Sequence, residues 1–349
     1  MKKLSLLNKI ILFINYIFVL LLVCTFFISK LPAEKFTFFT LLSLTVPFII
    51  IINFLLVLYW LIKKKKFFFI STITLFIAYF VLSPIYKFKD SNNDDVSKGD
   101  NFTLMTFNTR NFNVNGGLKI NNVDSLIVDF ITKKDVDILC FQEYHHAMKI
   151  SDKLKQYDYK FVDFIYGKNT GRVIQAIYSK YPILKVEPIE FPKSANSAIY
   201  ADVIIKKDTV RIYNLHLQSF NIEPEVSTIK NQDSKRLFTR LKKVLRLQKE
   251  QMLIIKDHYK KCTYRKILTG DFNNTQFSNT YGIVANDFQD SFIEAGEGFG
   301  LTYDLKGLPM RIDYILVDEA FEVLSHENFD VKLSDHYPLK ATLRLKDFK

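Results

Sequence analysis

Residues 136–143 have the sequence VDILCFQE, a mostly apolar run that ends at Gln142 and Glu143. A short apolar run of this length is typical of a strand that is buried on both faces. Just upstream, residues 123–132 space their apolar side chains at helical intervals, and residues 102–108 are apolar and rich in strand formers. These segments predict a strand, a helix and a second strand, with a carboxylate where the second strand stops.

The pattern continues to the C-terminus. Further strands are predicted at residues 160–166, 172–179, 183–191, 198–205, 210–217, 266–270, 311–317 and 339–345. One long helix is predicted over residues 234–258. Many strands with few helices indicate a layered domain of mixed α/β or α+β class. A polar linker at residues 87–101 precedes the domain, and residues 102–349 contain no second linker, so we expect one domain there.

Three long stretches near the N-terminus carry no charged residue, namely residues 10–29, 36–62 and 67–86. A helix needs about 20 mostly apolar residues to cross the hydrocarbon layer of a membrane. Buried helices of soluble proteins, the first alternative, rarely stay apolar on all sides for so long. A cleaved signal peptide is the second alternative, but no small-x-small cleavage site follows Ser29. We therefore expect a three-helix transmembrane anchor over residues 1–86.

Lysines flank these stretches unevenly. Seven lie before the first stretch or between the second and third, at Lys2, Lys3, Lys9, Lys63, Lys64, Lys65 and Lys66. Four lie on the opposite side, at Lys30, Lys35, Lys87 and Lys89. The positive-inside rule therefore predicts a cytoplasmic N-terminus. Three crossings then place the following domain outside the cytoplasm, in a protein of a bacterial inner membrane or plasma membrane.

Composition limits the class of protein. The 349 residues are 48% apolar, which excludes a disordered chain, and three cysteines are too few for a disulfide scaffold, so no disulfide-linked partner is expected. The net charge of +12 at first suggests a nucleic-acid binder. However, residues 1–86 hold nine Lys and one Glu, so +8 of this charge belongs to the anchor. Residues 230–266 hold 13 basic and three acidic residues, which fits a solvated helix face, a phosphate-binding surface or a contact with an anionic membrane.

Polar residues follow several predicted strands, where a rigid sheet presents side chains to a site. In chain order the motifs are TFN (106–108), FQE (141–143), NLHL (214–217), GDFN (270–273), RIDYI (311–315) and SDHYPL (334–339). Each motif alone has an ordinary structural explanation, because a Glu at a strand end is often a solvated rim residue and Asp and Asn favour turns. Only the set indicates chemistry.

The set supplies the groups that a phosphate-processing metal site needs. Glu143 and Asp335 offer hard oxygen ligands, which Mg²⁺ prefers. Asp313 can orient the imidazole of His336, because a carboxylate fixes the tautomer and favours imidazolium. Asp271 can align a water molecule. The expected contacts to phosphoryl oxygens are His216, Asn108, Asn273 and Arg110.

For Arg110, Thr302 and Tyr303, the sequence supports a role in the site and an ordinary structural role equally well. Arg110 is as readily an ordinary surface arginine as a phosphate contact. Thr302 and Tyr303, which precede the RIDYI motif, either line the pocket or form a turn. Asp290 is expected to be structural.

The six motifs in this order resemble the endonuclease/exonuclease/phosphatase family. That family includes deoxyribonuclease-like nucleases, abasic-site endonucleases, neutral sphingomyelinases and inositol polyphosphate 5-phosphatases. The motifs span residues 106–339, nearly all of the predicted domain. The resemblance implies an α+β domain in which two β-sheets pack face to face between helices, a four-layered α/β/β/α sandwich. It also implies a metal-dependent hydrolase of phosphate esters, with Mg²⁺ as cofactor and Mn²⁺ as a substitute.

The resemblance further implies a role for each motif residue. Glu143 is the expected principal Mg²⁺ ligand, with Asn108 beside it and Asp335 as a further carboxylate of the metal site. The expected catalytic group is His336, Asp271, Asp313 and His216. Within that group Asp313 holds the histidine and Asp271 aligns or deprotonates the attacking water. Asn273 and His216 are the implied contacts to phosphate oxygens.

The leading functional hypothesis is a membrane-anchored, Mg²⁺-dependent phosphoesterase that acts outside the cytoplasm. Its substrate stays open among phospholipids, inositol phosphates and other phosphomonoesters or phosphodiesters. An endonuclease acting on DNA or RNA is the alternative that uses the basic segment. A non-catalytic, anchored binding module that retains the fold is the alternative of another class.

Overall fold

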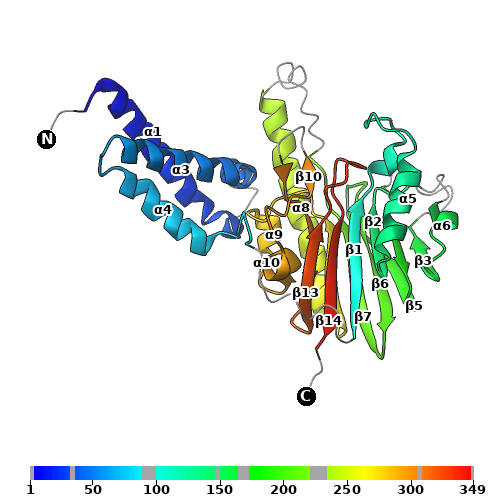
Figure 1. Cartoon of the computed structure of the whole chain (residues 1–349). Coiled ribbons are helices and arrows are strands. Elements are labelled where there is room, and N and C mark those ends of the chain that lie inside the picture. The colour runs from blue at the N-terminus through cyan, green and yellow to red at the C-terminus, as the bar shows by residue number, and fades with distance from the viewer. Residues whose placement is uncertain are drawn as a thin grey trace. The chain divides into compact units, whose positions relative to one another are not determined.

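The computed structural model describes residues 4–31, 36–88, 100–145, 150–163, 173–220, 234–304 and 309–346 (Figure 1). The chain divides into two units. A helical unit contains Met1–Ile85 together with Asn274–Ile283, and a larger unit contains Tyr86–Asn273 and Val284–Lys349. The break after residue 85 lies one residue from the predicted end of the anchor. Residues 274–283, which the sequence analysis assigns to the domain, group with the helices instead.

The helical unit contains two long helices and a shorter one. Its described helices are α1 (Leu6–Thr25), η1 (Ile28–Lys30), α2 (Thr37–Leu41), η2 (Leu42–Thr45), α3 (Val46–Ile62), α4 (Phe68–Val81) and α9 (Asn279–Gly282). Among the described residues, two helical segments are long and apolar enough to cross a membrane, Leu6–Thr25 and Leu42–Ile62. Helix α4 has 14 residues, which gives about 21 Å of helix. The third predicted span, residues 67–86, therefore contains a helix shorter than a hydrocarbon layer of about 30 Å.

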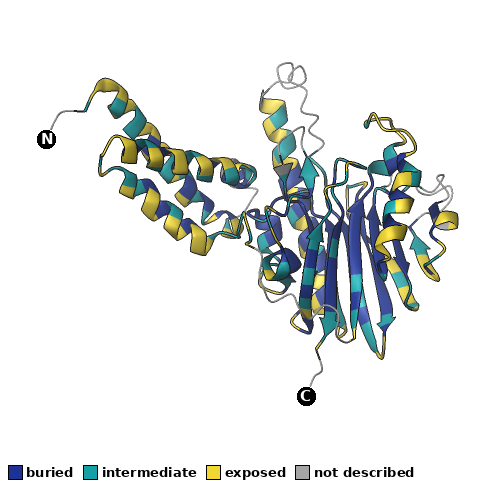
Figure 2. Ribbon diagram, in the orientation of Figure 1, coloured by how far each residue is buried: buried dark blue, intermediate teal, exposed yellow. Residues whose placement is uncertain are grey.

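Polar side chains meet inside the helical unit, whereas apolar ones face outward. Asn15 donates to Ser71 Oγ over 2.7 Å and accepts from Trp60 Nε1 over 2.8 Å. Ser71 Oγ in turn donates to Asn53 Oδ1 over 3.1 Å. All four residues are buried, while Phe, Leu and Ile side chains of α1, α3 and α4 are exposed (Figure 2). This distribution is the reverse of that in a water-soluble helical bundle.

The segment Asn274–Ile283 is held within the helical unit by its own side chains. Thr275 Oγ1 donates to the carbonyl of Ser43 over 3.0 Å. Asn279 Nδ2 donates to the carbonyl of Ser29 over 2.7 Å. These two bonds satisfy carbonyl groups close to helix ends, where the helix itself leaves acceptors unpaired.

Within the described residues, the larger unit contains two six-stranded sheets (Figure 1). The first has the order β13-β14-β1-β2-β4-β3 and comprises β1 (Asn101–Asn108), β2 (Ile138–Gln142), β3 (Tyr159–Val162), β4 (Ala176–Ser179), β13 (Phe321–Asn328) and β14 (Leu339–Leu345). The second has the order β5-β6-β7-β8-β12-β9 and comprises β5 (Ile183–Glu190), β6 (Ser197–Ile205), β7 (Asp208–His216), β8 (Arg265–Asp271), β9 (Gln289–Asp290) and β12 (Asp313–Val317). A short separate pair is formed by β10 (Tyr303–Asp304) and β11 (Pro309–Met310). The predicted α+β fold with two sheets is confirmed, although the sequence analysis missed β13 and the two-residue strands.

The two sheets share one apolar core. Because side chains alternate between the faces of a strand, every second residue of the central strands points into it. Leu104, Ile138 and Cys140 of the first sheet lie in this core with Ile212 and Ile267 of the second. The sequences of the central strands are therefore nearly continuous apolar runs, as in residues 136–143.

Helices cover the outer faces of both sheets. The described helices of this unit are η4 (Arg110–Asn113), α5 (Val123–Lys134), α6 (Ile150–Lys153), α8 (Ser234–Lys260) and α10 (Ser291–Ala295). Ile127 of α5 packs with Met105 and Leu139 in a second core on the first sheet. On the second sheet, the ring of His258 in α8 lies 5.5 Å from the ring of Tyr213.

The three cysteines all lie among the described residues and are free, as predicted. Cys140 is fully buried in β2, and burial raises the pKa of its thiol. Cys262 follows α8 and is partly exposed. It is therefore the accessible thiol of the larger unit.

A buried polar bridge joins the two sheets beside their common edge. Gln142 Nε2 donates to Asn214 Oδ1 over 2.6 Å and to Thr106 Oγ1 over 2.9 Å. Asn214 Nδ2 donates to the carbonyl of Phe141 over 2.9 Å. These residues belong to the motifs TFN, FQE and NLHL, so part of the sequence signature holds the sheets in register.

A buried ion pair anchors the segment before β12. The Arg311 guanidinium lies 2.6 Å from Asp290 Oδ2, and both side chains are 3% exposed. Its centre lies 4.8 Å from the ring of Phe292 and 4.9 Å from that of Tyr314. Asp290 also caps α10, because its Oδ1 accepts from the backbone N–H of Phe292 over 3.0 Å. The expected structural role of Asp290 agrees with these contacts.

Candidate active site

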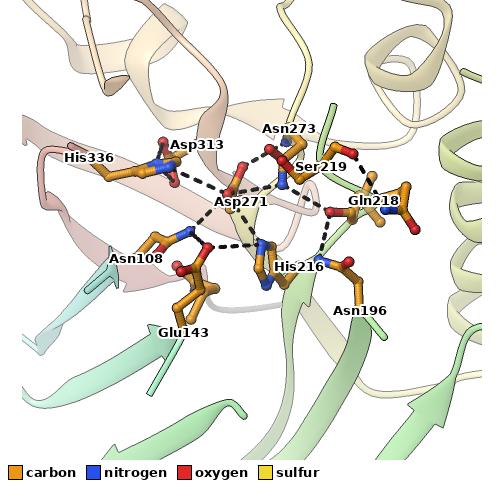
Figure 3. Close-up of polar contacts among 12 residues, drawn as sticks. Asn108, Glu143, Asn196, His216, Gln218, Ser219, Asp271, Asn273, Asp313 and His336 are labelled. Atoms are coloured by element: carbon orange, nitrogen blue, oxygen red, sulfur yellow. Dashed lines mark hydrogen bonds and ion pairs between the residues drawn. The ribbon is translucent and has the colours of Figure 1, made fainter. Parts of the chain in front are cut away.

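Strand register brings the polar motifs together at one edge of the sandwich. Strands β1 and β2 are parallel, with Asn108 opposite Gln142. Strands β7 and β8 are also parallel, with His216 opposite Asp271. Antiparallel β12 places Asp313 opposite the same Asp271. Because parallel strands end at the same edge, the motif residues of both sheets converge there (Figure 3).

Asp271 lies at the centre of the site and is buried. Its Oδ2 accepts from Asn108 Nδ2 over 3.0 Å, and its Oδ1 accepts from the backbone N–H of Asn273 over 2.7 Å. Burial and the neighbouring charge of Asp313 raise the pKa of this carboxyl group despite these hydrogen bonds. The raised pKa suits a group that accepts a proton from water near neutral pH.

A glycine sets the position of Asp271. Gly270 has a φ of 119°, and a Cβ at this residue would lie 2.2 Å from the carbonyl oxygen of Leu215. No other residue fits this backbone without displacing β7. The glycine of the GDFN motif is therefore required by close approach of two strands.

His336 and Asp313 form an oriented pair. Their closest contact is 2.9 Å between His336 Nδ1 and Asp313 Oδ2, and His336 Nε2 lies 3.7 Å from Asp271 Oδ2 (Figure 3). Burial lowers the pKa of His336, but Asp313 and Asp271 outweigh it and raise the pKa to about 10. Thr302 Oγ1 accepts from the N–H of Asp313 over 3.0 Å, and the ring of Tyr303 lies 4.6 Å from that of His336. Thr302 thus positions the pair, and Tyr303 lines the site.

Asp271, Asp313 and His336 form a group that can hold a divalent metal ion. Each offers one ligand atom, and these atoms lie within 4.8 Å of one another. This group differs from the metal ligands expected from the sequence, which are Glu143, Asp335 and Asn108. The hydrogen bond from His336 to Asp313 competes with metal binding, because His336 binds a metal only as neutral imidazole.

Glu143 and Asp335 offer a second set of hard oxygen ligands. Glu143 follows β2 with a φ of 48°, an uncommon value for a residue with a side chain and one that is often associated with functional sites. Burial raises the pKa of Glu143, and the negative charge of Asp335 adds to the increase. Two neighbouring carboxylates are a fitting donor set for a divalent cation.

Asn108 lies between the carboxylates of Glu143 and Asp271. Its Nδ2 donates to Glu143 Oε1 over 3.3 Å and to Asp271 over 3.0 Å, and its Oδ1 accepts from the N–H of Arg110 over 3.1 Å. In this amide orientation Asn108 aligns Glu143 and Asp271 through its nitrogen. A role of its oxygen as a metal ligand stays a prediction.

His216 is a buried imidazole between two carboxylates of the site. It is 2% exposed, and neither ring nitrogen has a hydrogen-bond partner among the described residues. Its Nε2 lies 3.6 Å from Asp271 Oδ2 and 3.7 Å from Glu143 Oε1. These contacts are not ion pairs, because burial and the charge of His336 lower the pKa of His216 to about 3. Since buried polar groups are normally hydrogen-bonded, an imidazole without a protein partner here is available to bind a polar ligand or water.

The remaining predicted contacts lie at the rim. Asn273 has a φ of 51°, and its Nδ2 donates to Asp271 over 3.1 Å and to the carbonyl of Leu217 over 2.9 Å. Arg110 Nε lies 3.5 Å from Asp335 Oδ2 with 42% of its side chain exposed. Asn273 therefore lies beside Asp271 and Arg110 beside Asp335. The roles of both side chains as phosphate contacts stay predictions.

The structure therefore gathers all nine residues singled out from the sequence in one place. They are Asn108, Arg110, Glu143, His216, Asp271, Asn273, Asp313, Asp335 and His336. Thr302 and Tyr303 were left undecided by the sequence, and their position just before the RIDYI motif was the only signal for them.

Two packed sheets with acidic, amide and imidazole groups at a shared edge are the arrangement that the sequence resemblance implies. Residues 105–336 match the family model "Endonuclease/Exonuclease/phosphatase family". The chain belongs to this family. Residues 8–85 match a second model, described as a domain of unknown function (DUF8431). No curated protein matches the chain.

Solved structures share the fold at low sequence identity. An endonuclease/exonuclease/phosphatase from Bacteroides vulgatus is 21% identical with a TM-score of 0.56, and the match covers 71% of this chain and 100% of that one. The D. rerio TDP2 complexed with single-strand DNA product is 16% identical with a TM-score of 0.55, covering 70% of this chain and 100% of that one. A family protein from Bacteroides thetaiotaomicron is 17% identical with a TM-score of 0.53, covering 70% and 97%. These matches show the fold alone.

Proposed function

We propose that the protein is a membrane-anchored, metal-dependent phosphoesterase that hydrolyses a phosphodiester or phosphomonoester by in-line attack of water. The observation that carries this proposal is the buried His216, whose Nε2 has no partner among the described residues and lies between Asp271 and Glu143. A phosphoryl oxygen supplies the acceptor that a neutral imidazole N–H requires.

Each remaining side chain has a role that its surroundings support. Asp271, with a raised pKa, aligns the attacking water and accepts its proton. His336 is an imidazolium held by Asp313, and its Nε2 donates toward the phosphoryl group, where negative charge develops. Asn273 and Arg110 add donors at the rim.

A divalent cation is part of the proposal. Glu143 and Asp335 would hold it, with Asn108 beside them, and Mg²⁺ fits these hard oxygen donors, with Mn²⁺ as a substitute. Such an ion supplies Lewis-acid activation and neutralises charge on the phosphate.

The membrane anchor is supported by the helical unit. Two helices have spanning length, their apolar side chains are exposed, and their polar residues hydrogen-bond one another inside. Polar residues that face the interior of a bundle are typical of membrane helices. We propose that α4, with the uncharged residues 82–86 that follow it, crosses as the third span. The larger unit then lies outside the cytoplasm, whereas two crossings would leave it inside.

Labelling of the native Cys262 tests this topology. In intact spheroplasts a membrane-impermeant maleimide should label the wild type, and Cys262→Ser should abolish the signal, because Cys262 is the accessible thiol of the larger unit. Labelling that occurs only after lysis would place the unit in the cytoplasm and remove the third crossing.

The reaction class is tested by a substrate panel with the full-length protein. Plasmid DNA, RNA, sphingomyelin, phosphatidylinositol phosphates and a bis-aryl phosphate should be offered with Mg²⁺, with Mn²⁺ and with EDTA. We expect hydrolysis of at least one ester, and EDTA should abolish it. Lack of metal-dependent hydrolysis across the panel, together with no Mg²⁺ or Mn²⁺ binding, would favour a non-catalytic binding module.

A nuclease is the second candidate function. The D. rerio TDP2 structure contains a single-strand DNA product, and the N-terminal part of α8 carries a basic group that includes Lys235, Arg236 and Lys243. DNA binding through this group should weaken steeply as salt rises, because bound cations are released from the nucleic acid. Salt-insensitive hydrolysis of a lipid or small ester would argue against it.

His216→Ala should lower kcat by about 10²-fold, because one donor to the developing charge is lost. His216→Asn retains an N–H donor and should keep more activity than the alanine variant. Steady-state kinetics on the bis-aryl phosphate measure both, with thermal melting as the check on folding. Wild-type kcat in His216→Ala would remove this residue from the proposed mechanism.

A further inference from the structure

Three exposed aromatic side chains gather where the chain enters the larger unit. Tyr86, Phe88 and Phe299 are 45%, 82% and 56% exposed. The ring of Tyr86 lies 5.1 Å from that of Phe88 and 4.9 Å from that of Phe299. We name these three residues the aromatic cluster.

The cluster is held in place by backbone pairing. Lys87 and Gly298 form an antiparallel bridge, in which each N–H donates to the other's carbonyl over 2.8 and 2.9 Å. The bridge sets Tyr86 and Phe88 beside Phe299 although about 210 residues separate them in the chain. A fixed group of exposed aromatic rings is unfavourable in water and marks a contact surface.

The position of the aromatic cluster in the chain indicates what the cluster binds. Helix α4 ends at Val81, so Tyr86 follows its last turn by five residues, a reach of at most about 18 Å. Tyr and Phe rings are suited to the headgroup layer of a membrane, where aromatic side chains concentrate. We infer that the aromatic cluster docks the larger unit onto the bilayer surface and that the substrate is a phosphodiester carried by a membrane lipid.

The cluster is also connected to the active site through neighbouring chain segments. Phe299 precedes Tyr303 by four residues, and the ring of Tyr303 packs against His336. A cavity of about 480 Å³ has Phe299, Asp304 and Tyr337 in its wall. Asp304 follows Tyr303, and Tyr337 follows His336, so the segments that carry the site also form this wall. A lipid held at the cluster therefore contacts a cavity whose wall is built from segments that also carry Tyr303 and His336.

This inference rests on the proposed phosphoesterase function, so its first test does not depend on catalysis. Phe299→Trp in the full-length protein, reconstituted in vesicles, should be quenched by lipids brominated near the headgroup. Leu184→Trp on β5, at a site that is 60% exposed, is the matched control and should not be quenched. The wild type, whose single tryptophan is Trp60, supplies the background. Equal quenching of the two variants would overturn the docking surface.

The second test separates lipid docking from hydrolysis itself. Phe88→Ser should raise KM for a phosphodiester lipid in vesicles by about tenfold, because one interfacial aromatic contact is lost. The same variant should hydrolyse the soluble bis-aryl phosphate like the wild type, and Leu184→Ser should change neither reaction. An unchanged KM for the vesicle substrate would contradict the inference, as would tight capture of a soluble protein at the cluster in place of lipid. If the wild type hydrolyses no ester of the substrate panel, the proposed function fails. If it hydrolyses another ester but not the lipid, the lipid substrate is overturned. In either case the quenching result still decides the docking surface.

Discussion

Glu143→Gln should lower kcat/KM for the hydrolysed ester by about 10³-fold, because the metal contributes several kcal/mol of charge stabilisation and each 1.4 kcal/mol is a factor of about ten. The substitution keeps the shape of the side chain and removes its negative charge. Titration calorimetry with Mg²⁺ or Mn²⁺ should show a parallel loss of affinity. Steady-state kinetics at saturating metal then measure what activity remains.

Two further variants make this result specific. Glu319→Gln changes an exposed carboxylate outside the site and should leave metal binding and hydrolysis unchanged. Asp313→Asn distinguishes the two possible ligand sets. Metal binding that survives in Glu143→Gln and disappears in Asp313→Asn would assign the ion to Asp271, Asp313 and His336 instead.

Asp290→Asn should destabilise the larger unit by about 3–5 kcal/mol, because it leaves the buried Arg311 guanidinium without its counter-charge. Asparagine still caps α10, so the loss reports the ion pair rather than the helix end. Unfolding by urea is measured in detergent, with a signal that reports on the larger unit.

Matched variants test the cause of that destabilisation. Replacing both partners, as Asp290→Asn with Arg311→Met, should recover part of the loss, because no buried charge remains. Asp257→Asn breaks the pair of Asp257 and Lys261, whose side chains are 69% and 73% exposed, and should leave the unfolding midpoint unchanged. If the variants of the buried and the exposed pair lowered stability equally, burial of Arg311 would not be the cause of the destabilisation.

Much of the site could be predicted because its residues follow apolar strands. Residues 136–143 predict a buried strand with Glu143 at its end, and β7 and β8 end at His216 and Asp271. Strand β12 instead begins at Asp313 and runs antiparallel to β8, so its first residue lies at the same edge. Parallel neighbours share an edge, so the end of a strand is a sound guide to where its polar residue lies.

Other features could not be predicted from the sequence, because they depend on pairing between residues far apart in the chain. Strand β13 (Phe321–Asn328) has the sequence FEVLSHEN, which lacks a strong apolar pattern, and its place is set by β14. The polar bridge from Gln142 to Asn214 connects residues 72 positions apart. The third apolar stretch was expected to fill residues 67–86, but the helix ends at Val81, shortly before Pro84, whose ring cannot continue a helix.

The pairing of β1 with β14 bears on when the site can form. Asn101 lies opposite Arg344, so the first strand of the larger unit stays unpaired on that side until residues 339–345 have been synthesised. Contacts of such large sequence separation form slowly, since the loop between them must close first. His336 enters the site from the same late segment. The complete set of site residues therefore comes together only after residues 336–345 have been synthesised.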